Sequence, residues 1–311
     1  MVTKDQKHLF DLDEDRNNKK PVTRIRATEE SLTIAQSVAD DLNIQMDEEK
    51  TRSLAMNLLG IYFSDITRVI KIQDPSMIFD HFVSDDISAY SGFTIDRQAI
   101  IFFDQNLDNW LFSIFQIFSI RAFFVVTDDV RKDTNEILSL ILSCLKQPSL
   151  HLNIRDRLRP YMSEYYNALP VINCLTMTSN AFIICHEIAH FQLKHNGKAN
   201  NYDQEYQADQ VAYKHLLTLC NTPNETNYLK ITPNFLCTPC LLMRCFDLVE
   251  RFYAKEAGAC KLRESHSHPP SEKRGIALER ANSKTWSPEA WHLYDGFNAT
   301  IDELASDLEL P

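Results

Sequence analysis

The sequence contains little glycine, with only six in 311 residues. The closest pair, Gly258 and Gly275, is 17 positions apart. Phosphate-binding loops need closely spaced glycines, and the serine elbow of α/β-hydrolases needs glycines flanking its nucleophile. The scarcity therefore argues against Rossmann enzymes, P-loop NTPases and α/β-hydrolases. Together with only twelve prolines, it favours long helices over a strand-and-turn sandwich.

Other features are also missing. A net charge of −11 argues against a nucleic-acid partner. The first residues are charged and lack the apolar segment of a secretory signal, and eight cysteines are too few for a disulfide scaffold, so we expect a cytoplasmic protein. The most apolar stretch, 110–126, is interrupted by Gln116 and Arg121. It predicts a buried core helix rather than a membrane span, and thus no membrane partner.

The length allows one large domain or two modest ones. Residues 1–28 are polar and predict a flexible lead-in. Residues 29–165 predict an N-terminal region of helices with a small sheet between Met77 and Phe103, and 166–311 predict a helical body; one compact unit containing both is the alternative. The fold class is therefore mainly α (α+β). Predicted helices begin at Glu29, cover 54–61, and then span 107–124, 134–147 with Asp133 as N-cap, 173–194, 203–219, 233–256, 270–281 and 288–308.

An HExxH motif lies at the end of the apolar helix 173–194. Positions i and i+4 share one helix face, so His186 and His190 can bind a single metal ion. Glu187 then faces a water on that metal. Zinc lowers the pKa of such a water to about 7, and the glutamate takes its proton during attack on a peptide carbonyl. The motif predicts a catalytic zinc site with Glu187 as general base.

A third zinc ligand is required. The metzincin pattern needs glycine at 193 and histidine at 196, but the sequence has Leu193 and Asn196. The segment Glu205-Tyr-Gln-Ala-Asp209 instead offers two carboxylates on one helix face. Gly197 is predicted to end the first helix, so that the chain can turn back and bring this segment to the metal. We assign Glu205 to the metal and Asp209 to the outer N–H of a ligating histidine.

Two other patterns have simpler interpretations. Cys237 and Cys240 have the spacing of half a structural zinc site, but a second pair is absent, so they predict buried or free thiols. An aromatic stripe at helical spacing predicts core packing rather than a binding groove. Its members are Trp110, Phe112, Phe115, Phe118 and Phe123.

A later segment, His268-Pro269-x4-Arg274, completes a recognisable order of motifs: HExxH, E-x-x-A-D and H-P-x4-R. This order resembles the gluzincin metallopeptidases that include the CAAX prenyl proteases and HtpX-type heat-shock proteases, in which a histidine at the position of His195 also recurs. The best overall likeness is to the soluble phage-exclusion Lit peptidase family. The motifs span about 177–278, and a weaker likeness reaches back to about residue 75.

The resemblance implies a cytosolic zinc endopeptidase of zincin-like fold that acts in phage defence. It further implies a translation elongation factor as substrate and a phage-derived activating partner. The absence of membrane spans matches the soluble branch of these peptidases. The substrate backbone of such enzymes commonly adds to a sheet edge beside the metal, and the strands within 77–103 are the candidates.

The last motif leaves alternatives open. His268 is a candidate catalytic residue that stabilises the oxyanion, a fourth zinc ligand, or merely part of a helix start at His-Pro-Pro. Arg274 either pairs with Asp209 or holds its loop, and His195 is interpreted as a packed or surface histidine. Two alternative functions also stand: a zinc-binding regulatory or interaction module without catalysis, which the intact Glu187 disfavours, and a peptidase that cleaves a transcriptional repressor.

Overall fold

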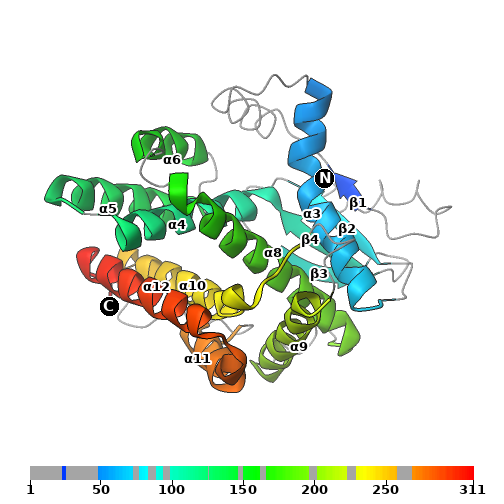
Figure 1. Ribbon diagram of the computed structural model, residues 1–311. Coiled ribbons are helices and arrows are strands. Elements are labelled where there is room, and N and C mark those ends of the chain that lie inside the picture. Colours follow the sequence, from blue (N-terminus) through cyan, green and yellow to red (C-terminus); the bar gives the residue numbers. More distant parts are fainter. Residues whose placement is uncertain are drawn as a thin grey trace.

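Helices form most of the described chain, and a small mixed sheet lies at one side of them (Figure 1). This computed structural model describes residues 23–25, 48–72, 77–82, 89–93, 99–124, 126–145, 150–161, 166–195, 202–222, 229–257 and 268–311. The mainly α fold with a small sheet, predicted from the sequence, is confirmed. The predicted helix from Glu29 lies outside the described residues, and the division near residue 165 stays a prediction.

The sheet has four strands in the order β1-β2-β4-β3. They are β1 (Thr23–Ile25), β2 (Ile78–Phe82), β3 (Ala89–Phe93) and β4 (Ala99–Asp104). β2 runs parallel to both β1 and β4, whereas β3 pairs antiparallel with β4 and forms an edge of the sheet. Every residue of β4 is buried, as expected for a central strand covered on both faces. Three strands match the predicted sheet region, while β1 comes from the predicted lead-in.

The helices follow the predicted ranges closely, because the apolar periodicity is strong from residue 105 onward. They are α3 (Glu48–Val69), α4 (Gln105–Phe123), α5 (Asp128–Ser143), α6 (His151–Leu158), α8 (Leu169–Gln192), α9 (Tyr202–Cys220), α10 (Thr238–Glu256), α11 (Ser271–Asn282) and α12 (Pro288–Asp307), joined in places by 3-10 turns at Arg159–Tyr161, Tyr166–Ala168, Pro233–Phe235 and Ser283–Thr285. The prediction of Asp133 as an N-cap was wrong, because α5 begins earlier, where the Thr127 hydroxyl accepts from the Val130 N–H. The short helix α6 was not predicted.

Helix α8 is the centre of the fold (Figure 1). It packs against α3, α4, α9 and α10 and against strands β3 and β4, so every residue from Thr178 to Ala189 is buried. Within the described chain, α8 is the one helix long and apolar enough to cross a membrane, and 67% of its most apolar window is buried inside the structure. The predicted aromatic stripe lies mainly in the same core, with Trp110, Phe115 and Phe118 fully buried, although Phe123 is exposed.

Helix α8 ends in a Schellman motif. The His195 N–H donates to the His190 carbonyl at 2.9 Å and the Lys194 N–H donates to the Phe191 carbonyl at 3.0 Å. Lys194 takes the left-handed conformation this motif requires, with φ of 56°. The prediction that Gly197 ends this helix was therefore wrong, since the chain already leaves the helix at Lys194; Gly197 itself lies outside the described residues. The motif folds His195 back toward His190.

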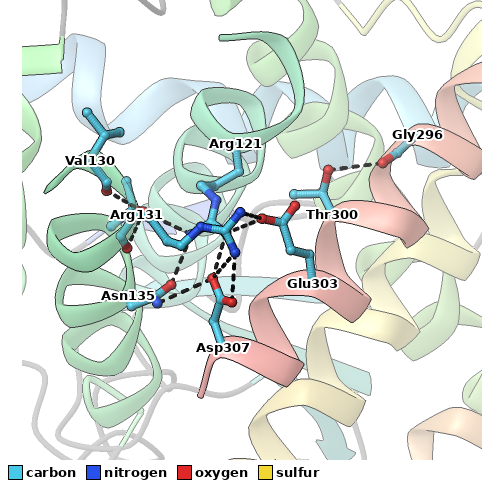
Figure 2. Close-up of polar contacts among 9 residues, drawn as sticks. Arg121, Val130, Arg131, Asn135, Gly296, Thr300, Glu303 and Asp307 are labelled. Atoms are coloured by element: carbon cyan, nitrogen blue, oxygen red, sulfur yellow. Dashed lines mark hydrogen bonds and ion pairs between the residues drawn. The ribbon is translucent and has the colours of Figure 1, made fainter. Parts of the chain in front are cut away.

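A buried arginine ties the C-terminal helix to the rest of the molecule (Figure 2). The side chain of Arg121 on α4 is fully buried, and its guanidinium donates to Glu303 at 2.6 Å and Asp307 at 2.7 Å on α12 and to Asn135 at 3.0 Å on α5. These hydrogen bonds offset the cost of burying the charge. Arg131 on α5 pairs with the same two carboxylates, but its side chain is 44% exposed.

The two arginines make a matched pair of substitutions. Arg121→Ala leaves Asp307 partly buried without its main partner, so we expect the free energy of unfolding to fall by about 3 kcal/mol. Arg131→Ala removes a solvent-screened pair and lowers it by less than about 1 kcal/mol. Urea unfolding followed by circular dichroism measures both values. Equal losses for the two variants would show that burial of Arg121 does not set its contribution.

Candidate metal site

Two helices bring three potential metal ligands together. His186 and His190 are one turn apart on α8, and their Nε2 atoms are 3.0 Å apart. Glu205, in the first turn of α9, places its carboxylate oxygens 3.4 Å from His186 Nε2 and 3.6 Å from His190 Nε2. All three ligand atoms lie within 4.8 Å of one another. The structure therefore joins the three residues that the sequence assigned to the metal.

The donor set suits a divalent cation. Glu205 Oε2 is buried and makes no hydrogen bond within the described residues, which is costly unless another group binds it. Ligand bonds of about 2.0–2.1 Å in a tetrahedral zinc site put the ligand atoms about 3.3 Å apart. The two Nε2 atoms are 3.0 Å apart, and each has one Glu205 oxygen at 3.4 Å or 3.6 Å, which is close to that value. Two imidazoles and a carboxylate are also an N2O set that zinc accepts. The His186, His190 and Glu205 group can thus hold a metal ion.

The far side of His186 is held by an ion pair. Its Nδ1 lies 2.9 Å from Asp209 Oδ1. Asp209, almost fully buried, also accepts two hydrogen bonds from Arg274, from Nε at 2.9 Å and Nη2 at 2.6 Å. The nearby Asp209 carboxylate therefore favours a proton on Nδ1 of His186, which leaves Nε2 for a metal. Of the two alternatives given for Arg274 from the sequence, the structure shows the pairing with Asp209. Nη1 of Arg274 also lies 3.7 Å from Glu205 Oε2.

These contacts shift the proton equilibria of the site. Burial by itself lowers the pKa of His186, but the contacts with Asp209 and Glu205 outweigh it and raise the pKa to about 9. Burial and the neighbouring His186 lower the pKa of His190 to about 4. Burial would raise the pKa of Asp209, yet Arg274 and His186 hold it well below its usual range. Without metal, His186 thus carries the proton of the histidine pair at neutral pH.

His190 has a different supporting residue. Its Nδ1 lies 3.0 Å from Nδ1 of His195, and His195 Nε2 lies 3.3 Å from Gln207 Oε1 on α9. The sequence predicts His195 to be a packed or surface histidine, and Gln207 was not identified from the sequence. The signal available was the five-residue spacing from His190, which a Schellman motif converts into contact.

Glu187 faces the sheet rather than α9. It is buried on the side of α8 that packs against β3, and its carboxylate accepts a hydrogen bond from Ser91 of that edge strand. Burial raises the pKa of Glu187, while His186 and Ser91 oppose the rise. A raised pKa strengthens the carboxylate as a base. Ser91 was not identified from the sequence, because nothing in the strand pattern indicates which residue faces α8.

The third motif lies at the mouth of the site. His268 Nε2 is 3.7 Å from Glu205 Oε2, and its side chain is 58% exposed. The motif continues into α11, whose first residue, Ser271, donates from its N–H and hydroxyl to Glu250 of α10. Gly275 lets α11 approach α10 closely, since a Cβ there would lie 3.2 Å from the Met243 Cβ. This packing of α11 on α10 places Arg274 beside Asp209. The catalytic role of His268 stays a prediction.

The cysteines behave as the simpler interpretation of their spacing predicted. Cys237, Cys240 and Cys245 are buried and free. Burial raises the pKa of Cys237 to about 12 and raises that of Cys240 well above its ordinary value. Protonated, desolvated thiols of this kind are poor nucleophiles and poor metal ligands. Cys260 and His266, which follow this pair in the sequence and could have added ligands to a structural zinc site, lie outside the described residues.

The fold and site define a mainly helical protein in which a buried His-His-Glu group between two helices can hold a metal, with a glutamate beside it. The chain belongs to the Peptidase U49 family, the Lit peptidase family, which matches residues 135–292. Family membership makes the protein a peptidase, hence a hydrolase with a protein substrate. Comparisons with curated proteins and with solved structures gave no match.

Alanine substitutions separate the two carboxylates of α9. Glu205→Ala removes a ligand atom, so we expect the protein to lose its metal on dialysis. Asp209→Ala leaves all three ligands and lowers metal affinity by about 10–100-fold, the usual cost of losing a residue that orients a ligand. Metal content measured by mass spectrometry after dialysis against a graded chelator distinguishes them. Greater metal loss in Asp209→Ala would reverse the assignment.

Metal binding should release a proton from His186. Because the pKa of His186 is raised to about 9, its proton is present throughout the physiological range and must leave before Nε2 can bind metal. Affinity should therefore weaken about tenfold for each unit that the pH falls between 8 and 6. Calorimetry in buffers of different ionisation enthalpy should give about one proton released per metal at pH 7.5.

Asp209→Asn is the control for this proton release, because it removes the carboxylate that raises the His186 pKa. Release at pH 7.5 should then fall. Binding by the unaltered protein without proton release would contradict the protonated state of His186.

Proposed function

We propose that this peptidase is a cytoplasmic zinc-dependent endopeptidase in which Glu187 is the general base. The observation that carries the proposal is the juxtaposition of Glu187 with the buried His186, His190 and Glu205 group in a chain of the Peptidase U49 family. A non-catalytic zinc module would have no need for a buried glutamate beside the ligands. The cost of burying Glu187 therefore favours a catalytic role.

The chemistry divides among the residues of the site. When bound, zinc supplies a Lewis acid that polarises the scissile carbonyl and lowers the pKa of water to about 7. Glu187 accepts a proton from the attacking water and passes it to the leaving amine nitrogen. Ser91 holds the carboxylate in place by hydrogen bonding. His268, at the mouth of the site, is positioned within reach of Glu205 and is our candidate for stabilising the oxyanion.

The edge strand β3 is our candidate for binding the substrate backbone. It forms an edge of the described sheet, and Ser91 at its middle contacts Glu187. An extended peptide added along such an edge gains backbone hydrogen bonds regardless of its sequence. Tyr90, 41% exposed and stacked on Phe102 at 4.7 Å, lies on the same strand. Peptide binding here would bring the scissile bond beside the general base.

The family supports a biological setting as well. We propose that the enzyme acts in defence against phage, that a phage-derived activator switches it on, and that its substrate is a translation elongation factor. These proposals rest on membership of the Lit peptidase family. They predict a protein that is inactive until infection.

A substitution of the general base tests the catalytic proposal. Glu187→Gln keeps all three ligands, so we expect stoichiometric zinc and a loss of proteolysis of about 10²–10⁴-fold. His190→Ala should lose both zinc and activity. Mass spectrometry of newly formed protein termini, in infected cells expressing either the active protein or Glu187→Gln, identifies the substrate. Undiminished cleavage by Glu187→Gln would rule out this mechanism, and cleavage confined to another protein would rule out the elongation factor.

A further inference from the structure

His195 is placed against His190 by the backbone itself. The Schellman motif at the end of α8 includes the hydrogen bond from the His195 N–H to the His190 carbonyl. This bond holds residue 195 over residue 190, and the two rings meet at a centroid distance of 5.1 Å with an interplanar angle of 67°. Their Nδ1 atoms are 3.0 Å apart. The contact is thus built into the way the helix ends.

The direction of this hydrogen bond follows from the other atoms. His190 Nε2 faces His186 Nε2 and Glu205, on the side where a metal would bind. If that nitrogen carries the lone pair, the proton of His190 is on Nδ1 and must be donated to Nδ1 of His195. His195 then carries its own proton on Nε2, where Gln207 Oε1, 3.3 Å away, accepts it. In this series of hydrogen bonds from His190 through His195 to Gln207, every N–H then faces an acceptor.

We propose that His195 is a positioning residue for the metal ligand His190, with Gln207 holding His195 in the required tautomer. His190 would then be oriented by a neutral imidazole in the way that Asp209 orients His186. The inference rests on the proposed metal site, but its central claim concerns a tautomer that exists without metal. It therefore can be tested separately from catalysis.

The same two helices carry a matched control. His215 on α9 lies with Nε2 2.7 Å from Gln192 Oε1 on α8. This pair has the same chemistry as His195 and Gln207 and also bridges α8 and α9, but no contact joins it to a proposed metal ligand in the described structure. A change that merely loosened the packing of the two helices would affect both pairs alike.

The experiment compares three variants. His195→Phe keeps a planar ring but removes the acceptor, whereas His195→Asn keeps an acceptor oxygen close to the position of Nδ1. We expect zinc affinity, measured by competition with a chromophoric chelator, to fall about tenfold in His195→Phe and to be largely restored in His195→Asn. His215→Phe should bind zinc as the unaltered protein does.

Nitrogen-15 NMR of the metal-free protein supplies the independent readout. We expect His190 to be protonated on Nδ1 in the unaltered protein and in His195→Asn, and to lose this preference in His195→Phe. Protonation of His190 on Nε2, with His195 as donor, would overturn the inference. Equal weakening of zinc binding in His195→Phe and His215→Phe would also overturn it. Failure of the unaltered protein to bind zinc would instead refute the proposed function, while the tautomer measurement would still decide the role of His195.

Discussion

The site depends on burying two carboxylates of α9 against the core helix α8. Glu205 and Asp209 are 7% and 1% exposed, and isolated charges at such depth cost several kcal/mol each. Arg274 and His186 supply the compensating positive charge, and both contact both carboxylates. Arg274 comes from α11, so the packing of α11 contributes to the charge balance at the α8 and α9 interface. The geometry of the candidate metal site is therefore linked to the packing of three helices.

The spacing of the site residues along the sequence explains how much of the site could be predicted. His186 and His190 share a helix face by spacing alone, and Glu205 and Asp209 do so on a second helix. Strong apolar periodicity fixed both helices to within a few residues, from Leu169 to Gln192 and from Tyr202 to Cys220. Since a metal requires a third ligand, pairing the two faces needed no tertiary information. The pairing of Arg274 with Asp209, one of two alternatives that the sequence left open, joins residues 65 positions apart, and Arg274 was singled out by a resemblance rather than by periodicity.

Contacts set by backbone conformation were beyond sequence reasoning. The end of α8 was assigned to Gly197 because glycine most readily adopts positive φ, yet Lys194 takes that conformation instead. This difference of three positions in the end of the helix decides whether residue 195 extends away from His190 or folds back onto it. Ser91 was not identified for a related reason. The alternation of residues along a strand assigns them to two faces, but it does not say which helix packs on each face. Side chains that support other side chains therefore had to come from the structure.

The helix ends add a further electrostatic bias to the site. His190 lies in the last turn of α8, where the helix dipole gives a partial negative charge that favours a cation. Glu205 lies in the first turn of α9, at the positive end of the helix dipole, which favours a carboxylate. Each effect contributes about 0.3–1 kcal/mol, and partial burial places this site toward the upper value. The Schellman motif at the end of α8 thus has two effects. It brings His195 onto His190, and it puts the negative end of the helix beside the candidate metal ligands.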